Sequence, residues 1–108
     1  RSKSEKIIAD LFEKYKIPYR YEPMLELSDG HCVFPDFVVL NVRLRKTIYW
    51  EHFGLITDGE YAKKTLQKLS FYEENGIVVG KDLLISIESD QIPLNVKLLE
   101  QKIHQYIL

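Results

Sequence analysis

Two apolar runs, VFPDFVVL (residues 33–40) and TIYWEHF (residues 47–53), decide the fold of this chain. Both are rich in β-branched and aromatic residues, and their length suits strands better than helices. A short basic connector, NVRLRK (residues 41–46), joins them. The pattern therefore predicts a central β-hairpin that ends at Gly54.

Each of these runs carries one acidic residue where a core residue would be expected, Asp36 in the first and Glu51 in the second. A hairpin centred between Arg43 and Leu44 would place Asp36 directly opposite Glu51. Two opposed carboxylates on half-buried strands repel each other, so we expect one to be protonated or a positive group to lie between them. A divalent cation is the simplest candidate. The alternative is that both acids lie on a solvated face and pair with Lys or Arg.

Composition limits the class of protein. The 108 residues are enough for one domain, residues 1–108, and 45% hydrophobic with 29% charged residues is typical of a soluble globular protein. No apolar run reaches membrane-spanning length, and the single Cys32 excludes an internal disulfide, so a cytoplasmic setting is expected. A net charge of −1 argues against a strong, indiscriminate nucleic-acid binder. The first residue is Arg1, from which we expect a domain excised from a longer protein.

The remaining elements follow from periodicity and punctuation. The pattern predicts a helix from Ser2 to before Pro18, a helix from Asp58 to residues 75–76, a strand over residues 81–88 and a helix after Pro93. It also predicts a strand over residues 19–26, in which Pro23 suggests an edge or a bulge. This αβββαβα order predicts an α/β fold with a mixed central sheet flanked by helices. Ser2 and Glu5 match a capping box, which explains Glu5 without any chemistry.

The second predicted helix carries one arc that should pack on the sheet. At about 100° per residue, the arc contains Tyr61, Ala62, Thr65, Leu66, Leu69 and Tyr72. Lys68 falls at the edge of this arc. Its ordinary interpretation is a lysine that lays its stem over a neighbouring tyrosine and extends its ammonium into solvent.

The chain resembles the PD-(D/E)XK nuclease superfamily of restriction-endonuclease-like domains. Pro35-Asp36 looks like the PD half, Glu51-His52-Phe53 looks like (D/E)XK with the lysine replaced, and the order of elements is similar to the αβββαβ core with an extra C-terminal helix. The YWEHFG segment (residues 49–54) resembles an uncharacterised bacterial branch of the superfamily. The resemblance implies that Asp36, Glu51 and the backbone carbonyl of His52 bind Mg²⁺ or Mn²⁺, and that Glu5 contacts the metal through water.

The departure from the family pattern is Phe53, which stands where the catalytic lysine is expected. In RecB-like members the following helix carries a Gln-x-x-x-Tyr motif, and here Lys68 and Tyr72 have the same spacing. We therefore expect Lys68 to be a migrated catalytic lysine, with Tyr72 packing or hydrogen-bonding beside it. Glu22 could supplement the site or pair with Arg20 at the surface. Phosphate contacts are expected from Arg43, Arg45 and Lys46, although a charged turn is their ordinary explanation.

These residues lead to a first hypothesis, a metal-dependent nuclease that cleaves phosphodiester bonds, with DNA favoured over RNA as the substrate by family analogy only. A second hypothesis is a catalytically inactive domain of the same fold that binds nucleic acid or a partner protein, which the missing lysine at Phe53 supports. A third is a structural module whose acids lie on a wet face. Homodimers or fused domains in a parent protein are compatible with all three.

Overall fold

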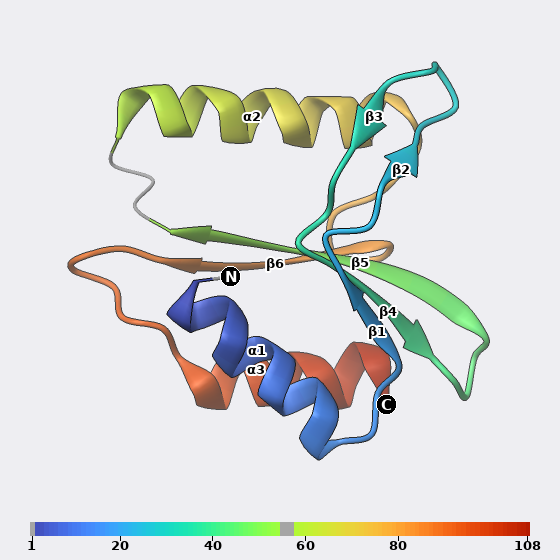
Figure 1. Cartoon of the computed structure of the whole chain (residues 1–108), viewed down its shortest axis with the longest axis vertical. Helices are drawn as coiled ribbons and strands as arrows, with labels where there is room; N and C mark the ends of the chain where they lie inside the picture. The colour runs from blue at the N-terminus through green and yellow to red at the C-terminus, as the bar shows by residue number, and fades with distance from the viewer. Residues whose placement is uncertain (1, 55–57) are drawn as a thin grey trace.

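The computed structural model describes residues 2–54 and 58–108 (Figure 1). In chain order its elements are α1 (Lys3–Lys14), β1 (Tyr19–Tyr21), β2 (Leu25–Glu26), β3 (Cys32–Val33), β4 (Phe37–Asn41), β5 (Lys46–Gly54), α2 (Gly59–Glu74), β6 (Leu83–Glu88) and α3 (Val96–Lys102), which continues as a π-helical turn, Ile103–Ile107. The predicted α/β class is confirmed.

The main sheet is mixed, as the order of elements predicts. Its strands lie in the order β1-β4-β5-β6. The pairs β1–β4 and β4–β5 are antiparallel, whereas β5 and β6 are parallel. A parallel neighbour requires a crossover connection, and α2 lies within that connection. Strands β2 and β3 form a separate two-stranded sheet.

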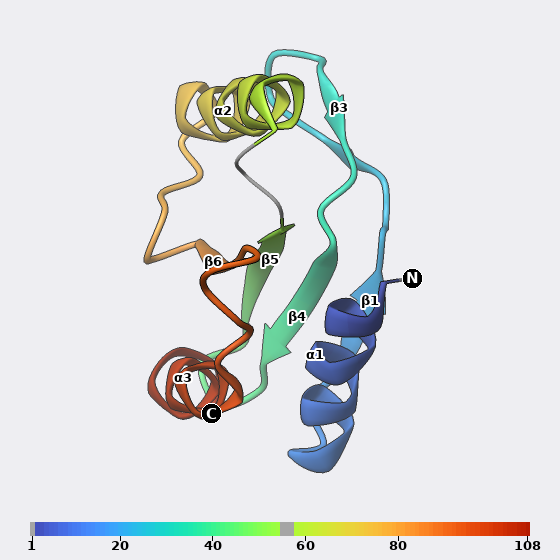
Figure 2. The ribbon, with the colours of Figure 1, turned by 90° about the vertical axis from the view of Figure 1, so that its left-hand side faces the viewer.

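The two faces of the main sheet bury different cores. On one face, Trp50 of β5 and Phe37 of β4 pack with residues of α1 and α3. On the other face, α2 packs with the β2–β3 hairpin in a second cluster that includes Tyr72 and Leu83 (Figure 2). Successive strand residues point to opposite faces, so Trp50 and Glu51 of β5 enter different layers. Glu51 therefore lies on the α2 side.

Two predicted strands are interrupted. In the first, Pro23 indicates an edge or a bulge, and β1 is an edge strand of the main sheet; the second was expected to be continuous. The strand over residues 19–26 divides at Glu22, which has a left-handed φ of +49°, and Pro23 follows it. The run over residues 33–40 divides at Phe34-Pro35. Because proline lacks the N–H that a ladder needs, the two segments leave the main sheet together and pair with each other, Leu25 opposite Val33. Glu22 thereby lies at a bend beside Asp36, whose carbonyl accepts its N–H at 3.0 Å.

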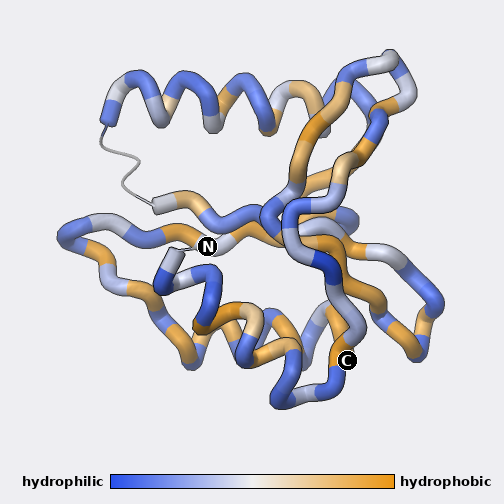
Figure 3. The backbone as a smooth tube through the Cα atoms, in the orientation of Figure 1, coloured by the Kyte–Doolittle hydropathy of each residue, from blue (hydrophilic) through white to orange (hydrophobic). Residues whose placement is uncertain are grey.

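Helix α2 begins and ends where the sequence predicts. Asp58 caps its N-terminus by accepting two backbone N–H groups, and Gly76 follows its C-terminus with a φ of +77°. The predicted inner arc is only partly right, because Leu66 is 68% exposed while Thr65 and Tyr72 are buried. The helix is mostly hydrophilic (Figure 3). Its inner side is therefore held partly by polar contacts.

The helices α1 and α3 cover the opposite face with apolar side chains. The ring of Phe12 in α1 lies 5.5 Å from that of Trp50 and 5.3 Å from that of Phe37, measured between centroids. Residues Leu99, Ile103 and Ile107 are the buried positions of the C-terminal helix. Among the described residues, no helix is both long and apolar enough to cross a membrane.

Candidate functional site

The β4–β5 hairpin brings Asp36 and Glu51 together. Phe37 pairs with Trp50 across the hairpin, so Asp36, the residue before β4, lies opposite Glu51. This is the register that the sequence predicts. Both acids line one cavity of about 170 Å³, together with His52, Phe53, Tyr61, Lys64, Thr65 and Lys68. Their carboxylates therefore face the same space between the sheet and α2.

Glu51 is the buried acid of the site, with 1% of its surface exposed. The Lys68 ammonium donates to Glu51 Oε1 at 2.9 Å, and the Tyr72 hydroxyl donates to Oε2 at 2.5 Å. Burial raises the pKa of Glu51 to about 7, and the charge of Lys68 and the hydrogen bond from Tyr72 oppose that rise. Glu51 thus titrates near neutral pH.

Lys68 supplies the positive group that two neighbouring acids require. It lies on the inner side of α2, and its ammonium also donates to the backbone carbonyl of Phe34 at 2.9 Å. The ammonium therefore joins β5 to the segment that precedes Asp36. Lys68 and Tyr72, four residues apart on one side of a helix, both end at Glu51.

Asp36 is half-buried, and its carboxylate is hydrogen-bonded to the backbone of β5. Its Oδ2 accepts the backbone N–H of His52 at 2.7 Å. Burial raises the pKa of the Asp36 carboxyl, while the His52 N–H and the charge of Lys68 counteract that effect. One carboxylate oxygen of Asp36 is thereby positioned by the backbone.

Two further acids approach Asp36 from the α1 side. Glu5 forms the predicted capping box with Ser2 and accepts a hydrogen bond from the Tyr21 hydroxyl at 3.2 Å. One carboxylate oxygen from each of Glu5, Glu22 and Asp36 lies within 4.8 Å of the other two. Glu5 therefore combines a capping role with a place beside Asp36.

The donor chemistry around Asp36 fits a hard divalent cation. Carboxylate oxygens are the ligands that Mg²⁺ and Mn²⁺ prefer, and Asp36 lies next to Glu51 on one side and to Glu5 and Glu22 on the other. Glu51 differs from the rest because both of its oxygens already accept hydrogen bonds. Asp36 is consequently the acid that lies close to each of the other three, Glu5, Glu22 and Glu51.

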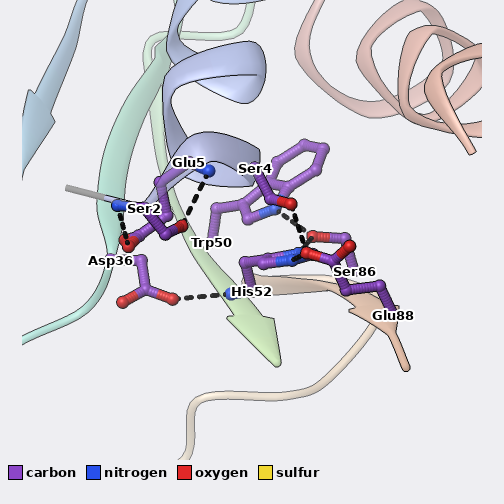
Figure 4. A network of polar contacts seen from close by, with 8 residues as sticks. All are labelled: Ser2, Ser4, Glu5, Asp36, Trp50, His52, Ser86 and Glu88. Atoms are coloured by element: carbon purple, nitrogen blue, oxygen red, sulfur yellow. Dashed lines mark hydrogen bonds and ion pairs between the residues drawn. The ribbon is translucent and has the colours of Figure 1, made fainter. Parts of the chain in front are cut away.

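Behind the site, the ring of His52 enters a buried polar network on the opposite face of β5 (Figure 4). Trp50 Nε1 donates to Ser86 Oγ at 3.0 Å, Ser86 Oγ lies 2.7 Å from His52 Nδ1, and His52 Nε2 lies 2.8 Å from Glu88 Oε1. Since the tryptophan N–H can only donate, every group of this network has a partner when the Ser86 hydroxyl donates to His52 Nδ1 and His52 Nε2–H donates to Glu88. Hydrogen bonds from Ser4 and His52 hold the pKa of Glu88 below its ordinary value.

The sequence analysis did not predict this network of Trp50, Ser86, His52 and Glu88. Ser86 and Glu88 are two apart on β6, so they share a face, and Ser86 pairs with His52 in the parallel register. Two polar residues at alternate positions of an apolar strand were the available signal. Ser86 is buried and accepts the Trp50 N–H. Through Ser86 and Glu88 the network fixes the His52 ring, and with it the part of β5 whose backbone N–H binds Asp36.

Replacing Ser86 with alanine should destabilise the protein by about 2 kcal/mol, because Trp50 Nε1 and His52 Nδ1 would both lose a buried partner. Urea denaturation of wild type and Ser86→Ala measures the difference. Ser70→Ala is the matched control, since Ser70 is exposed on α2, and its effect should stay within about 0.5 kcal/mol. An equally small effect of Ser86→Ala would mean that the network contributes little to stability.

Several sequence-predicted residues lie outside this cluster. Phe53 lines the cavity as a buried apolar side chain. Arg43, Arg45 and Lys46 lie at the other end of the hairpin, where Lys46, the nearest of them in the chain, is about 17 Å along β5 from Glu51 at the usual rise per residue. There Arg43 donates to the carbonyl of Leu108, and Lys46 pairs with Asp82. The structure does not bring these three cations to the acids.

Comparison with known proteins identifies an archaeal relative. The chain matches no protein-family model. It is 34% identical over 115 residues to the uncharacterized protein MJ1519 of the archaeon Methanocaldococcus jannaschii, an alignment that covers 94% of this chain. The chain spans only 9% of the length of that relative.

Proposed function

We propose that this chain is a nuclease domain of the PD-(D/E)XK type that hydrolyses phosphodiester bonds with the help of Mg²⁺ or Mn²⁺, and that DNA is its preferred substrate. The observation that carries the proposal is the Lys68 ammonium, 2.9 Å from Glu51 in the cavity that Asp36 also lines. The family resemblance expects two acids and a lysine to meet in this way. It also expects the αβββαβ order, and the preference for DNA rests on that analogy alone.

The metal would be held by Asp36, Glu51 and the backbone carbonyl of His52, with Glu5 and Glu22 as additional acids near Asp36. Bound there, the cation would polarise the scissile phosphate and lower the pKa of a bound water. The protein would supply position and charge around it. The backbone of His52 orients Asp36, and Tyr72 orients Glu51.

Lys68 has two tasks in this proposal. In the resting site its charge compensates Glu51, which burial would otherwise keep protonated to a higher pH. During hydrolysis the same ammonium would position the attacking water or stabilise the negative charge that develops on the phosphate. Because Lys68 comes from α2 and not from β5, the lysine that the family places at Phe53 would be replaced from across the cavity.

Calorimetric titration of Mn²⁺ into wild type and Asp36→Asn tests the metal site. Asparagine keeps an oxygen that can accept the His52 N–H but removes the charge, so we expect the variant to bind at least about tenfold more weakly. Asp10→Asn is a matched control, because Asp10 is an exposed acid of α1 that pairs with Lys6. Equal binding by wild type and Asp36→Asn would contradict the proposed metal site.

Cleavage assays then separate an enzyme from a binding domain. Wild type, incubated with plasmid and single-stranded DNA, should cleave only when Mg²⁺ or Mn²⁺ is present and should stop when EDTA is added. Metal binding without cleavage would favour the second hypothesis, a catalytically inactive domain of this fold that binds nucleic acid or a partner protein. The absence of both would make the acids structural.

A further inference from the structure

An exposed aromatic residue, Phe34, contacts Lys68 of the proposed catalytic cavity through its backbone. Phe34 lies between β3 and β4, two residues before Asp36, and 56% of it is exposed. Its own carbonyl accepts the Lys68 ammonium at 2.9 Å. The bend at Phe34-Pro35 thus buries Pro35 while its neighbour is left in solvent. An apolar ring exposed at this place has no role in either core.

An aromatic ring and an unpaired lysine of α2 line the cavity itself. Tyr61 is 38% exposed and lines the cavity together with Lys64. Lys64 is exposed and lies one helical turn before Lys68. Among residues 2–54 and 58–108, its ammonium makes no hydrogen bond or ion pair. One aromatic ring and one available cation therefore line the cavity, and the exposed Phe34 adjoins it through the contact of its backbone with Lys68. We call these three residues the rim.

From this rim we infer that the site takes single-stranded nucleic acid, with a base stacked on Phe34 and a phosphate near Lys64. The identity of the ligand rests on the function proposed above. Exposed aromatic rings stack on bases of any sequence, provided that the base faces are not already covered by neighbours in a duplex. The recessed position of Glu51 agrees with this choice, because a flexible single strand can enter a small cavity more readily than a rigid duplex.

A groove that follows a nucleic-acid backbone is usually strongly positive, and this protein is not. The chain has a net charge of −1, and Glu5, Glu22 and Asp36 lie close together. Stacking therefore carries most of the affinity, and the dependence of binding on salt is weak, since few phosphates are neutralised.

The test follows binding in a chelating buffer, where no cleavage occurs. Labelled oligothymidylate, its RNA counterpart oligouridylate and a hairpin duplex are titrated with wild type, Phe34→Ala and Leu66→Ala. Phe34→Ala should weaken single-strand binding about tenfold. Leu66 is exposed on α2 but does not line the cavity, so its variant should bind as wild type does. Comparison of the two oligonucleotides shows whether DNA or RNA is preferred.

A gain-of-signal variant removes the ambiguity of a misfolded Phe34→Ala. Phe34→Trp places an indole at this exposed position, while Trp50 is fully buried and gives a constant background. Its fluorescence should be quenched by oligothymidylate, whereas that of Leu66→Trp should not. Equal quenching of both variants, none in either, or tighter binding of the duplex would overturn the inference.

These outcomes are independent of the proposed nuclease activity. If wild type cleaves DNA with metal but Phe34→Ala binds and cleaves as well as wild type, the nuclease stands and the stacking surface is wrong. If Phe34→Trp is quenched by single strands and wild type never cleaves, the stacking surface stands and the nuclease proposal is wrong.

Discussion

Replacing Lys68 with methionine is expected to reduce cleavage about 10²- to 10³-fold and to destabilise the protein above neutral pH. Its ammonium is the only cation within 4.0 Å of the Glu51 carboxylate among the described residues. Without it, Glu51 must either remain charged in a buried position or take up a proton, and the first state costs about 3 kcal/mol. Methionine retains the length of the side chain, so the effect reports the charge.

Urea unfolding in a chelating buffer at about pH 5 and about pH 8 measures this effect. The loss in Lys68→Met should be larger at the higher pH, because Glu51 is protonated at the lower pH in both proteins. Lys64→Met is the matched control for stability and should change it by no more than about 0.5 kcal/mol. A Lys68→Met variant that cleaves at the wild-type rate would return Lys68 to its ordinary role of covering neighbouring side chains.

Replacing Glu51 with glutamine should abolish most cleavage and yet stabilise the protein above about pH 7. The folded protein holds a proton on Glu51 more tightly than the unfolded chain does, because burial raises the pKa from 4.5 to about 7. Between these two values the folded state therefore binds more protons, and the free energy of unfolding falls as the pH rises. The accumulated cost is about 3 kcal/mol above pH 7. Glutamine carries no charge and does not incur it.

The stability difference between Glu51→Gln and wild type, measured by urea unfolding across this pH range, isolates Glu51 from other titrating groups. The variant should gain on wild type from about pH 4.5 upward, and the difference should level off above about pH 7. Asp36, whose pKa is also raised by burial, contributes to both proteins. A wild type that becomes more stable than the variant as the pH rises would show that the folded pKa of Glu51 lies below 4.5.

Local signals explain why much of the fold was predictable. Asp58 and the Ser2–Glu5 pair cap helices through backbone N–H groups a few residues away, and such contacts need no tertiary structure. The breaks at Glu22-Pro23 and Phe34-Pro35 were harder to predict. Each proline marks a place where the hydrogen bonding of a β-ladder is interrupted. Where the segment beyond it pairs next depends on a partner strand elsewhere in the chain.

The orientation of α2 shows the limit of periodicity. Helical spacing placed Leu66 on the inner arc and Lys68 at its edge, whereas in the structure Leu66 is exposed and Lys68 contacts Glu51. Apolar residues alone determine which side of a helix faces the core only when burial of apolar surface dominates the packing of that helix. Here a buried carboxylate on the facing strand selects the lysine and the tyrosine, which the sequence of the helix does not disclose.

The sequence by itself determined the hairpin register and the pairing of Asp36 with Glu51, because alternation and turn position act between residues close in the chain. Only the tertiary structure decided that Lys68 and Tyr72 reach Glu51, that Glu5 and Glu22 approach Asp36, and that Ser86 and Glu88 hold the ring of His52. These contacts join segments that are distant in the chain. Their geometry depends on how the helices and the parallel strand β6 pack on the sheet, which no local pattern specifies.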